Sequence, residues 1–128
     1  MLVGFHHVTL RVTDLARSRS FYSALPGFDL DQDFPDLGKL RYRVGQTQAR
    51  LVLAAPLPGS VTDPFDEHRI GLDHLAFACA NRSQLAEWEA RLNEMGIANG
   101  GIVDASYGSG VSFRDPDNIA LEFFAPPG

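Results

Sequence analysis

The chain repeats one order of structural elements, and this repeat constrains its fold more than any other feature. In the first half, an alternating pattern rich in β-branched residues predicts a strand over residues 5–12. Asp14 is placed to cap a helix over residues 15–25, which Pro26 and Gly27 end. Strand-like segments follow at 28–33, 40–44 and 49–54. The first half therefore reads strand, helix, strand, strand, strand.

The second half repeats this order. Residues 72–80 predict a strand, and Asn81 followed by Gln84 is typical of a helix start. Apolar residues at 85, 88, 92 and 95 form a helical stripe that ends at Gly96. Segments 97–104, 110–114 and 119–125 read as strands, with a turn at 115–118 and a hairpin loop at 107–110. That loop is expected to be an ordinary connection, with a mobile cover over a site as the alternative.

A segment rich in proline and glycine separates the halves. We expect one α+β domain over residues 1–128, with the first module at 1–56, a linker at 57–69 and the second module at 70–128. A four-stranded sheet with one helix leaves one face bare. Two βαβββ modules are therefore expected to pair as an open, barrel-like mixed sheet with the helices outside. This pairing would occur within one chain or be exchanged between two chains, and both remain open.

Composition excludes several classes of protein. With 11 basic and 16 acidic residues, the formal net charge of −5 disfavours nucleic-acid binding. No apolar run is long enough for a membrane span. Cys79 is the sole cysteine, so no internal disulfide can form, and its parity in the strand predicts a core position. The N-terminal residues lack a signal-peptide pattern, so we expect a cytoplasmic protein.

Three polar side chains stand out on the predicted strands. His7 lies in a polar row with Thr9 and Arg11, whereas the alternate residues of that strand are apolar. His74 interrupts an apolar strand, and Glu122 lies between Leu121 and Phe123 in the last strand. A carboxylate buried there without a partner would be costly.

Two histidines and one carboxylate form the facial set that binds Fe(II) and also serves Mn, Ni, Co or Zn. We therefore take His7, His74 and Glu122 as candidate ligands. The alternative is two core histidines and a carboxylate with another partner. His6 falls on the opposite face of its strand, and His68, in the linker, is expected to be solvated.

Several segments resemble the glyoxalase/bleomycin-resistance/extradiol-dioxygenase superfamily, also called the vicinal oxygen chelate superfamily. They are residues 7–22, 25–28, 73–77 and 113–123. The resemblance implies paired βαβββ modules with metal ligands on the first and last strand of each module. These positions are His7, His74 and Glu122, while Val52 stands at the fourth and cannot bind a metal. Glyoxalase I members usually have four ligands, so Val52 counts against that activity.

The resemblance implies a divalent-metal-dependent enzyme that chelates two oxygens of a small substrate. Isomerase, lyase, thiol transferase and dioxygenase chemistry stay open, as does the metal, and no catalytic base is identified. The alternative is a metal-free protein that sequesters small molecules or antibiotics, like the bleomycin-resistance members. A homodimer is expected. Candidate pocket residues are Thr9, Arg11, Arg50, Val52, Tyr107 and Phe124.

Overall fold

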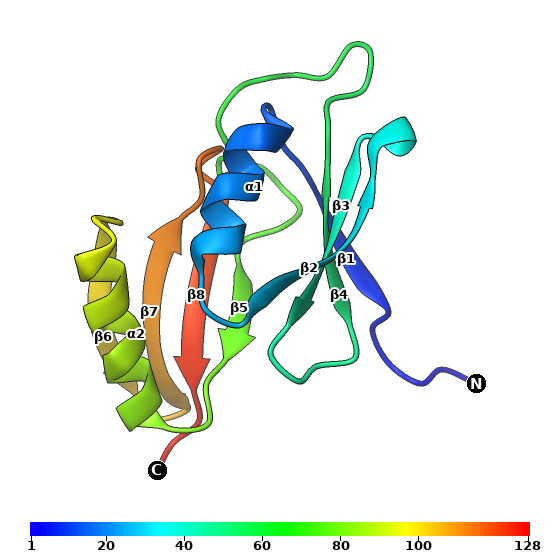
Figure 1. Ribbon diagram of the computed structural model, residues 1–128. Helices are drawn as coiled ribbons and strands as arrows, with labels where there is room; N and C mark the ends of the chain where they lie inside the picture. The colour runs from blue at the N-terminus through cyan, green and yellow to red at the C-terminus, as the bar shows by residue number, and fades with distance from the viewer. The chain divides into compact units, whose positions relative to one another are not determined.

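The computed structural model describes all 128 residues. They form two compact units, residues 1–63 and 64–128, and the boundary falls inside the segment expected to be the linker. Each unit has one α-helix and one four-stranded mixed sheet, so the fold is α+β with two βαβββ units (Figure 1). No helix is long and apolar enough to span a membrane.

The first unit has its strands in the order β1-β4-β3-β2, with β1 and β4 parallel and the other pairs antiparallel. Its elements are β1 (His7–Arg11), α1 (Leu15–Ala24), β2 (Phe28–Phe34), the short 3-10 helix η1 (Pro35–Leu37), β3 (Lys39–Val44) and β4 (Arg50–Ala54).

A helix cap and a set of buried side chains explain how α1 begins and how it packs on the first sheet. The Asp14 side chain accepts a hydrogen bond from the Arg17 amide at 3.0 Å, which satisfies an amide at the start of α1. The predicted apolar row of β1 faces the core, where Leu10 is buried. Tyr22 of α1 is fully buried, and its ring lies 6.5 Å from that of Tyr42 on β3. The helix and one face of the sheet therefore form a continuous core.

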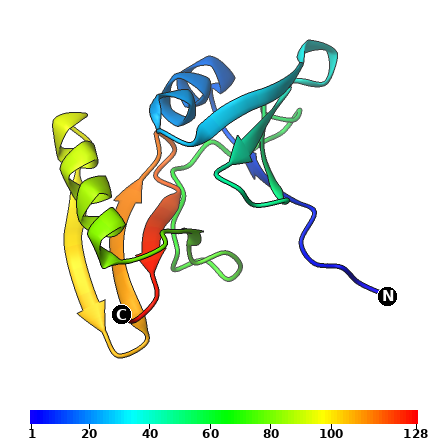
Figure 2. The ribbon, with the colours of Figure 1, turned by 60° about the horizontal axis from the view of Figure 1, so that its bottom comes forward.

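The second unit repeats the order as β5-β8-β7-β6, again with one parallel pair, β5 and β8. Its elements are β5 (Leu75–Ala78), α2 (Arg82–Glu94), β6 (Asn99–Ala105), β7 (Gly108–Arg114) and β8 (Ala120–Ala125). Helix α2 lies along one face of this sheet (Figure 2). We call the opposite face of each sheet its helix-free face.

The predicted capping pair starts α2. The Asn81 side chain accepts from the Gln84 amide at 2.9 Å, and the Gln84 side chain accepts from the Ala80 amide at 2.9 Å. Trp88 stacks on Phe123 of β8, with ring centroids 3.9 Å apart. The apolar stripe of α2 and the odd-numbered residues of β8 thus make the core of this unit.

Two of the predicted boundaries that differ from the structure lie next to the candidate site. A strand over 72–80 was expected, but β5 begins at Leu75, opposite Leu121, so His74 precedes the strand. The parallel ladder of β5 with β8 starts only at this pair. Residues 107–110 were expected to be a loop, but β7 begins at Gly108 and the turn is limited to residues 106–107. Pairing with both β6 and β8 holds Ser109 and Gly110 in the sheet and overrides the turn preference of glycine.

Candidate metal centre

Glu122 lies on the helix-free face of the second sheet. Its neighbours Leu121 and Phe123 point to the helix side and are each 1% exposed, whereas the Glu122 side chain is 22% exposed. Strand β8 is flanked by β5 and β7, so this carboxylate lies over the middle of the sheet rather than at an edge. A charged group so placed needs a partner of opposite charge.

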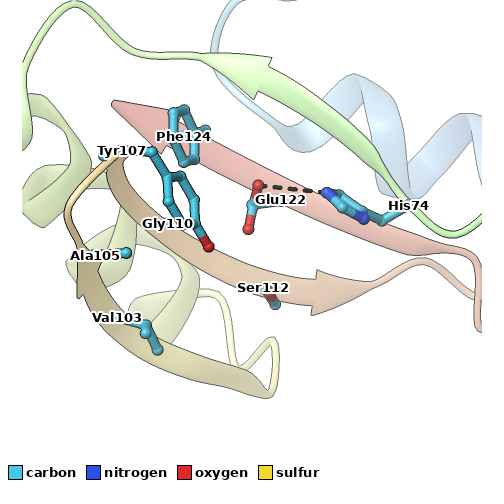
Figure 3. Close-up of a pocket in the computed structure, with 9 residues that line it drawn as sticks. His74, Val103, Ala105, Tyr107, Gly110, Ser112, Glu122 and Phe124 are labelled. Carbon is cyan, nitrogen blue, oxygen red and sulfur yellow. Dashed lines mark ion pairs between the residues drawn. The ribbon is translucent and has the colours of Figure 1, made fainter. Parts of the chain in front are cut away.

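The nearest nitrogen to this carboxylate belongs to His74. Its Nε2 atom lies 3.6 Å from Oε1 of Glu122 (Figure 3). Its Nδ1 atom lies 2.7 Å from Oδ2 of Asp73. When Nδ1–H donates to Asp73, the lone pair on Nε2 is directed towards Glu122. This is the arrangement in which a carboxylate orients a histidine for metal binding. The sequence prediction did not include Asp73, although its position beside His74 was a signal.

Gly110 of β7 makes room for the Glu122 carboxylate. A Cβ atom at this position would lie 2.7 Å from Oε2 and 3.0 Å from Cδ of Glu122. Gly108 has the same relation to Phe124, since a Cβ atom there would overlap its ring. Both glycines lie in the predicted hairpin loop at 107–110, but glycine inside a strand often marks such a close approach.

An aromatic pair lies beside the carboxylate. The rings of Tyr107 and Phe124 are stacked 6.2 Å apart and inclined by only 9°, and Tyr107 is 74% exposed. Together with Glu122 they border a hollow of about 270 Å³ (Figure 3). Its lining residues are His74, Val103, Ala105, Tyr107, Gly108, Gly110, Ser112, Glu122 and Phe124.

A second hollow adjoins His74 and is bordered by an ion pair. Arg114 of β7 donates to Glu67, with Nη2 and Oε1 2.9 Å apart. The hydrogen bond from Arg114 lowers the pKa of Glu67 to about 2. Because Arg114 already neutralises Glu67, the carboxylates left for a cation in this region are Asp73 and Glu122.

The candidate residues of the first unit lie on its helix-free face. His7 is exposed on β1, opposite Arg50, and Thr9 is opposite Val52. His7 thus precedes the Thr9–Val52 pair by two residues. His74 precedes the pair of Ala76 with Glu122 by the same interval, so Val52 holds in the first unit the place of Glu122 in the second.

The predicted pocket arginines of this unit are engaged with the protein. Arg11 donates from Nη1 to the Ala55 carbonyl at 2.7 Å, and Arg50 donates from Nε to Asp31 at 3.1 Å. His6 lies beside His7, with their Nδ1 atoms 2.8 Å apart.

The structure brings His74 and Glu122 together in the second unit and places His7 in the first. Neither unit gathers three potential ligands by itself. Two other groups take no part in this arrangement. His68 is 86% exposed, and its ring is hydrogen-bonded to the Asp66 carboxylate. Cys79 is buried, and this burial raises the pKa of its thiol.

The matched family model is that of the Glyoxalase/Bleomycin resistance protein/Dioxygenase superfamily, over residues 4–123. Among solved structures, a glyoxylase/bleomycin resistance protein/dioxygenase domain from Frankia sp. EAN1pec is 32% identical, with a TM-score of 0.86. That alignment covers 99% of this chain and 94% of the other. No curated relative matches the sequence.

Two further structures share the fold at lower identity. The lactoylglutathione lyase of Agrobacterium tumefaciens is 18% identical, with a TM-score of 0.76, covering 97% of this chain and 94% of that one. An antibiotic binding protein from Streptomyces sp. CB03234 is 22% identical, with a TM-score of 0.75, covering 98% of both chains. The family match, the two βαβββ units and the Frankia relative agree: the chain belongs to the glyoxalase/bleomycin resistance protein/dioxygenase superfamily.

Proposed function

We propose that the protein is a divalent-metal-dependent enzyme that acts on a small oxygenated molecule by bidentate chelation. His74 and Glu122 are two ligands, and His7 of the first unit is the third. The observation that carries the proposal is that Nε2 of His74 lies 3.6 Å from Oε1 of Glu122. Glu122 can take this position because Gly110 has no side chain to clash with its carboxylate.

The residues present fit such a metal. No arginine or lysine pairs with Glu122, and the nearest nitrogen is Nε2 of His74, which carries no charge in its neutral form. An imidazole nitrogen and a carboxylate oxygen are ligands for Fe, Mn, Ni, Co and Zn alike, so the donor set leaves the metal's identity open. A set of three ligands also leaves coordination positions for two oxygens of a substrate.

Each neighbouring residue has a role in this proposal. A bound divalent ion would act as a Lewis acid towards the chelated oxygens. Asp73 holds the His74 ring in the ligating tautomer, and Gly110 gives the Glu122 carboxylate its position. Tyr107 and Phe124 offer an apolar wall to the rest of the substrate. We keep isomerase, lyase, thiol transferase and dioxygenase chemistry open, and we propose a cytoplasmic homodimer.

Metal titration of the chelator-treated, dialysed protein tests the ligand set. Calorimetry with Co²⁺, Ni²⁺, Mn²⁺ and Zn²⁺, and anaerobically with Fe²⁺, is expected to show about one site per chain. The variants His74→Ala and Glu122→Gln are expected to lose this site while circular dichroism stays unchanged. His68→Ala is the matched control, because His68 is an exposed histidine of the same unit. Full metal stoichiometry in His74→Ala would contradict the assignment.

The second candidate function is sequestration of a small molecule or antibiotic without a metal. The exposed Tyr107, stacked parallel to Phe124, favours it, because such a pair can hold a planar ligand. An antibiotic binding protein also shares the fold. Two results together would favour this function over the enzyme. The wild-type protein would take up none of the five ions, and planar antibiotics would quench its fluorescence in the wild type but not in Tyr107→Ala.

A further inference from the structure

The helix-free face of the first sheet is strongly basic. Strand β3 alternates between the buried residues Leu40 and Tyr42 and three cations, Lys39, Arg41 and Arg43. The cations share the parity of Arg50 and Val52 on β4, since Arg43 pairs with Arg50 and Arg41 with Val52 in the ladder. These basic residues gather on one face of a chain whose net charge is −5. We call Lys39, Arg41, Arg43 and Arg50 the basic row.

One aspartate, Asp31, forms ion pairs with two members of this row. Oδ2 of Asp31 lies 3.1 Å from Nη2 of Arg41 and 3.1 Å from Nε of Arg50. Asp31 occupies an irregularity in β2, where the register shifts between Leu30 and Gln32, and such bulges redirect a side chain. Partial desolvation raises the pKa of Asp31, but the hydrogen bonds and charges of Arg50 and Arg41 outweigh it, so the pKa is lower than usual.

The rest of the row is less fully compensated. Arg43 is exposed and forms no ion pair; in the sheet it lies between Asp29 of β2 and Arg50 of β4, and like charges opposite each other repel. Lys39 also forms no ion pair. The four cations of the row thus face two carboxylates, Asp29 and Asp31. The bonds of Arg50 use Nε and Nη1, and those of Arg41 use Nε and Nη2, which leaves one terminal nitrogen of each without a protein acceptor. The row thus presents surplus positive charge and unused donors to one side of the sheet.

We propose that the basic row is a binding subsite for the carboxylate or phosphate group of a small anionic ligand. Guanidinium groups offer paired N–H donors that match the oxygens of these anions, and bidentate pairs of this kind are strong. Asp31 holds Arg41 and Arg50 in place, and Arg43 and Lys39 supply the unmatched charge. The inference rests on the proposed function in that the anion would be part of the substrate, so it narrows the substrate to an oxygenated acid or phosphate ester.

The test uses metal-free protein, so that it does not depend on the metal site. Inorganic phosphate and malonate are titrated separately while arginine side-chain N–H resonances are followed by NMR. Saturable shifts in Arg41, Arg43 and Arg50 are expected. Preference for phosphate over malonate identifies a phosphate ester as the ligand class, and the reverse identifies a carboxylic acid. Both results support the subsite.

Three variants test whether the basic row is the site of anion binding. Arg43→Ala removes a side chain with no ion pair, so the fold is expected to persist while anion affinity falls about tenfold or more. Asp31→Asn is expected to raise the affinity, because the amide oxygen can still accept from Arg41 and Arg50 while the competing negative charge is removed. Arg82→Ala is the control, since Arg82 is paired with Asp104 in the other unit. Equal loss in Arg82→Ala and Arg43→Ala, or no saturable shift in the wild type, would overturn the proposal, whatever the metal titration shows.

Discussion

Replacing Gly110 with alanine adds a methyl group where β7 passes the Glu122 carboxylate. The new Cβ atom would lie 2.7 Å from Oε2 and 3.0 Å from Cδ of Glu122, well inside contact distance. Gly110 has no positive φ, so its backbone accepts alanine without strain. The clash falls on the far end of a flexible side chain, which can turn away. We therefore expect a stability cost near the lower end of the ~1–3 kcal/mol typical of overpacking.

The effect on metal affinity is expected to be larger than the effect on stability. Glu122 can avoid the methyl group only by turning its carboxylate out of the position that it holds beside Nε2 of His74. Changes in residues that position a ligand typically lower metal affinity about 10–100-fold, or ~1.4–2.8 kcal/mol. Calorimetric titration of the chelator-treated variant with Co²⁺ measures this change, and urea unfolding measures the stability.

Alanine variants of two other glycines provide comparisons for Gly110→Ala. Gly100→Ala is the matched control, because its Cβ atom would have no neighbour nearer than the Ser112 carbonyl at 4.0 Å. Gly108→Ala is expected to disrupt the fold itself, because Gly108 has a φ of +144° and its Cβ atom would lie 2.5 Å from the Ala125 carbonyl. Wild-type metal affinity in a folded Gly110→Ala protein would refute the reasoning.

Three further predictions concern stability. Phe123→Ala removes a buried ring stacked on Trp88 and is expected to cost ~3–5 kcal/mol in urea unfolding followed by tryptophan fluorescence; a cost below about 1 kcal/mol would contradict this packing. Asn81→Ala removes the cap of α2 and is expected to cost about 1 kcal/mol, measured in the same way, whereas no change would show that the cap is dispensable. The hydrogen bond from Arg114 lowers the pKa of Glu67 from 4.5 to about 2, so this pair stabilises the fold above about pH 4.5 and loses its effect as the pH falls towards 2. The melting temperature of Glu67→Gln should therefore be below that of the wild type at pH 7, and the two should converge near pH 2. A difference in melting temperature that grows as the pH falls would contradict this prediction.

Local signals in the sequence predicted the order of elements well. Asp14 and Asn81 cap their helices as expected, because an N-cap depends on residues within one helical turn. The parity of Glu122 between Leu121 and Phe123 predicted its face, since side chains alternate along any strand. These inferences need no knowledge of which strands are neighbours.

Features that depend on strand pairing were not predicted. The start of β5 after His74 depends on where its ladder with β8 begins, at the pair of Leu75 with Leu121. The position of Gly110 beside Glu122 depends on the register of β7 with β8. The contact of Asp31 with two arginines likewise needs the irregularity in β2. The joint ligation of a metal by His7, His74 and Glu122 stays a prediction.

Elemental analysis of protein purified without chelator and without an affinity metal tests the central claim most directly. We expect about one Fe, Mn, Ni, Co or Zn per chain, and we expect it to be lost when either His74 or Glu122 is replaced. A wild-type protein that carries none of these metals, and takes up none when they are added, would contradict the metal site and favour the sequestering function.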